Sequence, residues 1–173
     1  MYKVKEIFRS IQGEGFNTGK ESVFIRFSGC NFWNGRVEDR LEAKCNFCDT
    51  DFVGVNGKNG GNYNLKELIE VVERVWDLSF SLKKKNVILT GGEPLLQVDK
   101  KLLDFLKKKN FTVAVETNGS IIFAHVATSR DPVVYISRVA FSRSVWKKFP
   151  SHLRSSLMVQ QQRVRYNFGL LST

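Results

Sequence analysis

The chain has 173 residues, of which 42% are hydrophobic, and a formal net charge of +10. This length and composition are typical of one globular domain, and no uncharged apolar run approaches the roughly 20 residues that cross a bilayer. The first ten residues lack the apolar core of a signal peptide, so we expect a cytoplasmic protein without a membrane anchor.

The positive charge is unevenly distributed along the chain. Residues 1–119 contain 19 Lys/Arg and 16 Asp/Glu, whereas residues 120–173 contain 8 Lys/Arg and a single acid, Asp131. A basic tail can bind phosphates, but this one has no helix-turn-helix pattern, aromatic RNA-binding motif or zinc-finger spacing. Direct nucleic-acid binding is therefore not expected, and a nucleic-acid-binding module is kept as an alternative.

Strand and helix patterns alternate over the first two thirds of the chain. In chain order we expect a strand at 23–28, a helix at 65–76 capped by Asn64, a strand at 86–90, a helix at 100–110 and a strand at 111–117. This order predicts βαβ units with parallel strands, whose ligands bind at the carboxyl ends of the strands. Residues 133–137 could add a strand and residues 157–171 a helix, but neither has clear caps.

Three motifs follow the three predicted strands. Cys30 comes two residues after the first strand, Gly-Gly-Glu-Pro (91–94) follows the second, and Glu116, Thr117 and Asn118 close the third. Because parallel strands end at the same edge of a sheet, we expect these motifs to converge on one rim.

The chain has three cysteines, Cys30, Cys45 and Cys48. An odd number of clustered thiols in a reducing compartment more often binds metal or performs chemistry than forms disulfides. A structural zinc site would need a fourth ligand, and the two histidines, His125 and His152, lie far along the chain. Three thiolates suit a [4Fe–4S] cluster with one iron open to another ligand, while a zinc-stabilised module stays the alternative.

The cysteines, the aromatic Phe47 just before the last of them and the Gly-Gly-Glu-Pro segment together resemble the radical S-adenosylmethionine (SAM) superfamily. The cysteine spacing of fourteen and two residues, in place of the more common three and two, is similar to one branch, the 7-carboxy-7-deazaguanine synthases of the queuosine pathway. Further stretches resemble that branch in the same order along the chain, namely residues 7–31, CDTDF (48–52), LTGGEPLLQ (89–97) and VETNG (115–119).

This resemblance implies a fold and a chemistry. The fold would be α/β, an incomplete (β/α) barrel of the radical SAM type with parallel strands. The activity would be a lyase that converts 6-carboxy-5,6,7,8-tetrahydropterin to 7-carboxy-7-deazaguanine with loss of ammonia, using a [4Fe–4S] cluster, SAM and Mg²⁺. An electron donor such as flavodoxin or ferredoxin and a homodimer are also implied. A glycyl-radical activating enzyme of the same superfamily is the nearest alternative.

The resemblance also implies site residues, with a cofactor-derived radical and no catalytic side chain. The cluster ligands would be Cys30, Cys45 and Cys48, and Thr50 would bind Mg²⁺. Cofactor contacts would come from Phe47, Asp49, Gly91, Gly92, Glu93, Glu116 and Asn118, and substrate contacts from Ile11, Gln12, Gly13, Glu14, Arg26 and Thr90.

Arg26 also stands out without the resemblance, because it interrupts an otherwise apolar strand. An unpaired buried charge costs several kcal/mol, so Arg26 should meet an anion, either a substrate carboxylate or the partner in a structural salt bridge.

Residues 120–173 depart from the pattern of the branch. We expect residues 1–119 to form the radical SAM core with the cluster loop and a substrate-binding N-terminus. Residues 120–173 lack the expected Ser-Pro-Lys and C-terminal histidine-and-proline segments. They are expected to form a divergent, less ordered part of the same domain, either genuinely divergent or read in another frame, and to impair activity.

Overall fold

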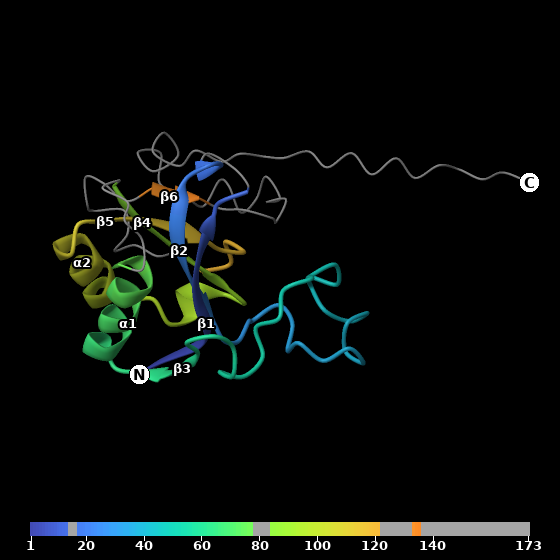
Figure 1. Ribbon diagram of the computed structural model, residues 1–173. Helices are drawn as coiled ribbons and strands as arrows, with labels where there is room; N and C mark the ends of the chain where they lie inside the picture. The colour runs from blue at the N-terminus through green and yellow to red at the C-terminus, as the bar shows by residue number, and fades with distance from the viewer. Residues whose placement is uncertain (14–16, 78–83, 122–132, 136–173) are drawn as a thin grey trace, which may run out of the picture.

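The computed structural model describes residues 1–13, 17–77, 84–121 and 133–135. The elements are β1 (Tyr2–Ile11), β2 (Glu21–Phe27), β3 (Gly61–Tyr63), α1 (Leu65–Asp77), β4 (Lys85–Gly91), η2 (Pro94–Leu96), α2 (Lys100–Lys108), β5 (Phe111–Glu116) and β6 (Val133–Tyr135). The strands form a six-stranded sheet in the order β3-β1-β2-β4-β5-β6. In Figure 1, α1 and α2 lie together against the sheet, and the long loop between β2 and β3 projects away from them.

The strands β2, β4, β5 and β6 run parallel to one another, which confirms the predicted βαβ order. Strands β1 and β3 were not predicted, and both pair antiparallel, β1 with β2 and β3 with β1. The connection from β1 to β2 explains this direction: residues 12–20 are too few for a crossover between parallel strands, which needs a dozen or more. The first three residues of the predicted strand 133–137 form β6, and the predicted helix at 157–171 lies outside the described residues.

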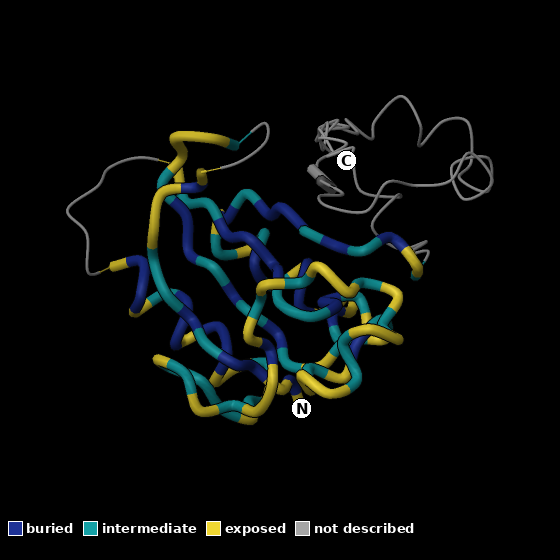
Figure 2. The backbone as a smooth tube through the Cα atoms, turned by 90° about the vertical axis from the view of Figure 1, so that its right-hand side faces the viewer, coloured by how far each residue is buried: buried dark blue, intermediate teal, exposed yellow. Residues whose placement is uncertain are grey.

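The two faces of the sheet differ in chemistry. The face under the helices is apolar and buried, and it carries Val4, Ile7, Val23, Ile25, Phe27, Val87, Leu89, Val113 and Val115. The opposite face, called the inner face below, carries a small apolar cluster of Phe24, Ile88 and Ala114. Because side chains alternate along a strand, Arg26, Thr90 and Glu116 share this inner face. Figure 2 shows the contrast between the buried strands and the more exposed loops.

Both helices start as their sequences predict. Asn64 Oδ1 accepts the N–H of Glu67 (3.0 Å), and Glu67 Oε2 accepts the N–H of Asn64 (2.8 Å), a reciprocal capping box. The buried face of α1 is apolar, with Leu65 packed at its margin, and it consists of Leu68, Ile69, Val71, Val72, Val75 and Trp76. Asp99 caps α2 by accepting the N–H of Leu102 (2.9 Å), and its Oδ1 also accepts the hydroxyl of Tyr2 (2.9 Å).

No helix in the described ranges combines the length and apolar character needed to cross a membrane.

Replacing Asp99 by Ala should destabilise the protein more than a substitution at an exposed position usually does, although Asp99 is exposed. The change removes the cap of α2 and leaves the Tyr2 hydroxyl, on a residue only 7% exposed, without its acceptor. We expect the free energy of unfolding to fall by about 2 kcal/mol in chemical denaturation. Asp104→Ala, which breaks an exposed pair with Lys100 on the same helix, should cost less than about 0.5 kcal/mol. Equal losses would contradict the capping role.

Candidate active site

The end of β4 packs directly against the segment that leads to Cys30. A Cβ at Gly92 would lie 2.0 Å from the carbonyl oxygen of Gly29, and one at Gly91 would lie 2.3 Å from that of Phe27. Gly91 also has a φ of +129°, which side chains disfavour. These glycines therefore let β4 contact the start of the cysteine loop. The cofactor contacts predicted for Gly91 and Gly92 remain predictions.

Glu93 joins the three strand ends. Its backbone N–H donates to the carbonyl of Gly29 (2.9 Å), beside Cys30. Its carboxylate accepts the Thr117 hydroxyl (2.7 Å), the N–H of Asn118 (2.7 Å) and the N–H of Leu95 (2.9 Å), the last of which starts η2. Glu93 is 0% exposed, and burial raises the pKa of its carboxyl above the ordinary value even though these three donors act in the opposite direction. The predicted convergence of the three motifs on one rim is confirmed.

Asn118 links this rim to Cys30. Its side-chain Nδ2 donates to Asn31 Oδ1 (2.9 Å) and lies 3.9 Å from Cys30 Sγ, while the N–H of Phe32 points at the same sulfur (3.4 Å). N–H groups directed at a sulfur stabilise negative charge on it, as they do around iron–sulfur clusters. Asn31 Nδ2 also bonds Ser120 Oγ (2.8 Å), so the residue after Cys30 is held by residues that follow β5, and Gly29, before Cys30, is held by Glu93.

The three cysteines fit an iron–sulfur cluster by number and by donor type. All three are half-buried, lie outside any disulfide and are placed on the loop between β2 and β3. Cys45 and Cys48 form a turn closed by the N–H of Cys48 and the carbonyl of Cys45 (3.4 Å). Among the described residues, no three Cys, His, Asp or Glu side chains are already gathered closely enough to hold a metal ion. Binding would therefore have to draw the sulfurs together, as metals commonly do with their ligand loops.

The segment after Cys48 is fastened to β1 by a buried lysine. Lys5 Nζ donates to the carbonyl of Val53 (2.8 Å) and to Asn56 Oδ1 (2.9 Å), and it pairs with Asp51 Oδ2 at 2.8 Å. The hydrogen bond from Lys5 lowers the pKa of the Asp51 carboxyl. These contacts fix the chain next to Thr50. The Mg²⁺ role of Thr50 remains a prediction, as do the cofactor contacts of Asp49 and Phe47, which are both exposed.

A hydrogen-bonded network crosses the inner face. Glu116 accepts the Gln12 amide at Oε1 (2.7 Å) and the Thr90 hydroxyl at Oε2 (2.8 Å). Gln12 lies 104 residues from Glu116 in sequence and is 8% exposed. The structure thus brings together two predicted substrate contacts and one predicted cofactor contact. Gly13, next to Gln12, is exposed, and Glu14 lies outside the described residues.

Arg26 meets an anion within the chain. Its Nε donates to Glu6 Oε1 at 2.7 Å, and its guanidinium lies 5.8 Å from the centre of the Phe8 ring. Phe8 in turn stacks on Phe24, with ring centres 5.2 Å apart. The salt bridge, one of the two partners expected for Arg26 from the sequence, is therefore present. Contact between Arg26 and the substrate carboxylate remains a prediction. The sequence analysis did not predict Glu6, Phe8 or Phe24 as site residues. The alternation of side chains along β1 and β2 puts all three on the inner face and is the pattern that could have identified them.

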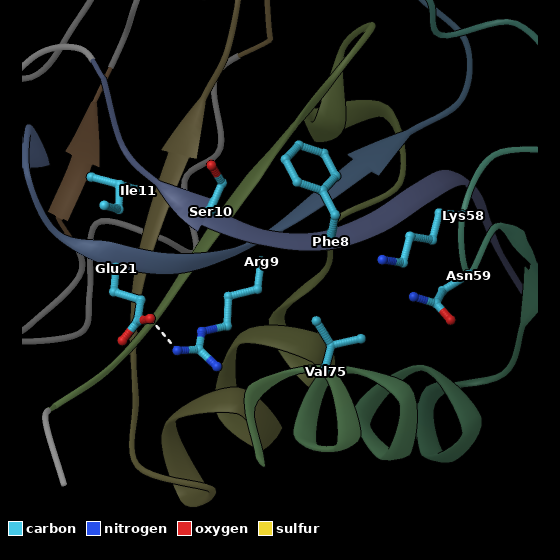
Figure 3. A pocket seen from close by; sticks show the side chains of 8 residues that line it. All are labelled: Phe8, Arg9, Ser10, Ile11, Glu21, Lys58, Asn59 and Val75. Carbon is cyan, nitrogen blue, oxygen red and sulfur yellow. Dashed lines mark hydrogen bonds and ion pairs between the residues drawn. The ribbon is translucent and has the colours of Figure 1, made fainter. Parts of the chain in front are cut away.

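Ile11 lies apart from the inner-face network. It is 65% exposed and lines a cavity of about 450 Å³ between β1, α1 and residues 58–59, which Figure 3 shows. Arg9 and Glu21 form an ion pair in this cavity, and the Arg9 guanidinium lies over the ring of Trp76 on α1 (5.6 Å). The cavity is therefore on the side of β1 that faces the helices, and Ile11 and Gln12 occupy different environments.

The raised pKa of Glu93 predicts a pH-dependent stability. The native state holds this proton more tightly than the unfolded state, whose carboxyl has the ordinary value near 4.5. The free energy of unfolding should therefore fall as pH rises from about 4 through the raised native pKa. Measured by urea unfolding, wild type should lose stability relative to Glu93→Gln over this window. The matched change Glu70→Gln, at an exposed carboxylate, should not alter the slope. If the free energy of unfolding of wild type instead rises with pH relative to Glu93→Gln, the three hydrogen-bond donors lower the pKa of Glu93 by more than burial raises it.

Comparison with known proteins agrees with this geometry. The family model described as the radical SAM superfamily matches residues 42–153. Curated proteins named 7-carboxy-7-deazaguanine synthase are 53% identical in Bradyrhizobium diazoefficiens and 50% identical in Burkholderia multivorans, in each case over 121 residues. These matches cover 69% of this chain and 57% of each relative, so the chain spans little more than half the length of the curated relatives it matches.

A solved structure gives a similar answer for the fold. The crystal structure of QueE from Escherichia coli matches with a TM-score of 0.54 and 26% identity, covering 78% of this chain and 59% of that one. The α/β architecture, a mixed sheet in which β2, β4, β5 and β6 run parallel, is consistent with the partial barrel that the sequence predicted. The family model covers more than half of the chain, and the three sequence motifs of the chain meet at one rim, so the chain belongs to the radical SAM superfamily.

Proposed function

We propose that this protein is a radical SAM lyase that converts 6-carboxy-5,6,7,8-tetrahydropterin to 7-carboxy-7-deazaguanine with loss of ammonia, in queuosine biosynthesis. The observation that carries the proposal is the convergence of Cys30, the Gly-Gly-Glu-Pro turn and Asn118 on one rim, next to a polar inner face. The names of the relatives support the same reaction.

The rim is the proposed cofactor site. Cys30, Cys45 and Cys48 would hold a [4Fe–4S] cluster through three of its irons, which leaves one iron open to SAM. When bound, the cluster supplies the electron that cleaves SAM and so generates the radical. The rim residues position and shield this chemistry: Asn118 directs an N–H at Cys30, and Glu93 keeps Asn118 in place.

The inner face is the proposed substrate site. Gln12 and Thr90 present an amide and a hydroxyl, groups suited to the edge of a pterin ring, and Glu116, which the resemblance implies as a cofactor contact, holds both through its carboxylate. Arg26 would meet the substrate carboxylate through its terminal nitrogens, because its Nε already bonds Glu6. Thr50 with a substrate carboxylate would bind Mg²⁺, which prefers oxygen ligands and keeps several waters.

The remaining features of the proposal concern the cellular context. We propose a cytoplasmic homodimer that receives electrons from a flavodoxin or ferredoxin and does not bind nucleic acid directly. The expectation that residues 120–173 impair activity stays a prediction, since of these only 120, 121 and 133–135 are described. The comparisons support neither the activating-enzyme alternative nor the zinc-stabilised module, because the named relatives are all 7-carboxy-7-deazaguanine synthases.

Anaerobic reconstitution tests the cofactor and the reaction together. We expect about four iron and four sulfide per chain, with broad visible absorbance. Replacing any one of the three cysteines by Ala should abolish the absorbance, whereas Leu41→Ala, at an 89% exposed position of the same loop, should not. With SAM, a reductant and the carboxypterin, mass spectrometry should detect 7-carboxy-7-deazaguanine. Zinc without sulfide in the purified protein would refute the proposal.

Arg26→Ala tests the substrate site. Loss of a charge-assisted contact should weaken pterin binding by about 2 kcal/mol, or about 30-fold in Kd, while reductive cleavage of SAM continues. Glu6→Gln is the matched control, because it breaks the same salt bridge but leaves the guanidinium in place. If both variants weaken binding equally, Arg26 acts by holding Glu6 and does not contact substrate.

A further inference from the structure

The fourteen residues between Cys30 and Cys45 form a loop anchored by aromatic contacts. Trp33 is 8% exposed and meets Phe52 edge to face, with ring centres 5.7 Å apart, and its Nε1 donates to the carbonyl of Arg36 (3.0 Å). Phe52 is 1% exposed, and its carbonyl accepts the N–H of Gly29 (3.1 Å), the residue before Cys30. The inserted loop is thus fixed to the point where the cysteine segment begins.

Arg40 extends this anchor to the other two cysteines. Its guanidinium lies over the Trp33 ring, 4.5 Å from the centre. Its Nη1 donates to the carbonyl of Cys48 (2.9 Å) and lies 3.3 Å from that of Asn46. Both carbonyls belong to the turn between Cys45 and Cys48, whose own backbone bond is long, at 3.4 Å. One side chain of the inserted loop therefore bonds two carbonyls of this turn.

We propose that Arg40 is a positioning residue for the cluster, which holds the Cys45–Cys48 turn through the carbonyls of Asn46 and Cys48. This inference rests on the proposed cluster site. A planar, permanently charged guanidinium can stack on an indole and donate in its own plane at the same time, which lysine cannot do. Its charge beside the turn also favours the more negative, reduced state of a thiolate-bound cluster, so Arg40 should influence the potential as well as the placement.

A purely local role in fastening the inserted loop makes a different prediction. In that case, loss of Arg40 would lower the stability of the cluster-free chain but leave a bound cluster with its normal properties. A positioning role instead changes the cluster itself. The two can be separated by measurements that do not depend on turnover.

The test uses the reconstituted full chain with the variants Arg40→Gln, Arg40→Lys and Arg36→Gln. Arg36 lies in the same inserted loop, is exposed and contributes its backbone carbonyl to the Trp33 contact, so its side-chain change is the matched control for charge. The measurements are the iron content, the rate of iron transfer to a chelator, the midpoint potential by redox titration followed by electron paramagnetic resonance, and the thermal unfolding of the cluster-free chain.

For Arg40→Gln we expect iron transfer to be several-fold faster and the midpoint potential to be more negative. Arg40→Lys keeps the charge, so its midpoint potential should stay close to that of wild type. It loses the planar group that lies over Trp33, so its iron should still transfer to the chelator faster than in wild type. Arg36→Gln should match wild type. Wild-type potential and iron transfer in Arg40→Gln, or equal changes in Arg36→Gln, would overturn the inference. If wild type itself binds no cluster, the proposed function fails instead.

Discussion

The buried carboxylate of Glu93 is the interaction on which the site depends. It accepts hydrogen bonds from the residues that follow β5 and from the first turn of η2, while its own N–H bonds the carbonyl next to Cys30. Three strand ends that are far apart in sequence therefore share one acid. Burying a carboxylate is costly unless its oxygens are satisfied, and the three donors around Glu93 reduce this cost, although burial still raises the pKa of its carboxyl. The same arrangement demands glycine at residue 92, since a Cβ there would collide with the backbone before Cys30.

The sheet separates stability from chemistry. Its helix-covered face is a continuous apolar core, whereas its inner face carries Arg26, Thr90 and Glu116 around a small cluster of apolar side chains. Each of these polar groups has a partner in the chain: Glu6 for Arg26, and Glu116 for both Thr90 and Gln12. A face whose polar groups are already oriented can bind a polar ligand with little rearrangement.

The cysteine loop is ordered by a different kind of contact. Residues 28–60, all of which the structure describes, contain no helix or strand, so only scattered backbone hydrogen bonds, such as that from Gly29 to Phe52, hold this loop. Cations and aromatic rings take that role, with Arg40 over Trp33 and Lys44 over Phe32, and Lys5 binds the segment that follows Cys48. Such contacts keep the thiols half-exposed while fixing the chain around them, which suits a loop that must close on a cofactor.

Local sequence patterns were enough to predict the helices, the parallel strands and the order of the motifs, because amphipathic periodicity and caps such as Asn64 act over a few residues. It did not reveal β1, where an irregular register between Val4 and Glu6 places both Val4 and Ile7 in the core and breaks the simple alternation of a strand. It could not choose between a substrate carboxylate and a salt bridge for Arg26, because Glu6 becomes its neighbour through strand pairing. The contacts of Gln12 with Glu116 and of Arg40 with the Cys45–Cys48 turn depend on the tertiary structure, because strand pairing and loop packing, which no local pattern specifies, bring these residues together.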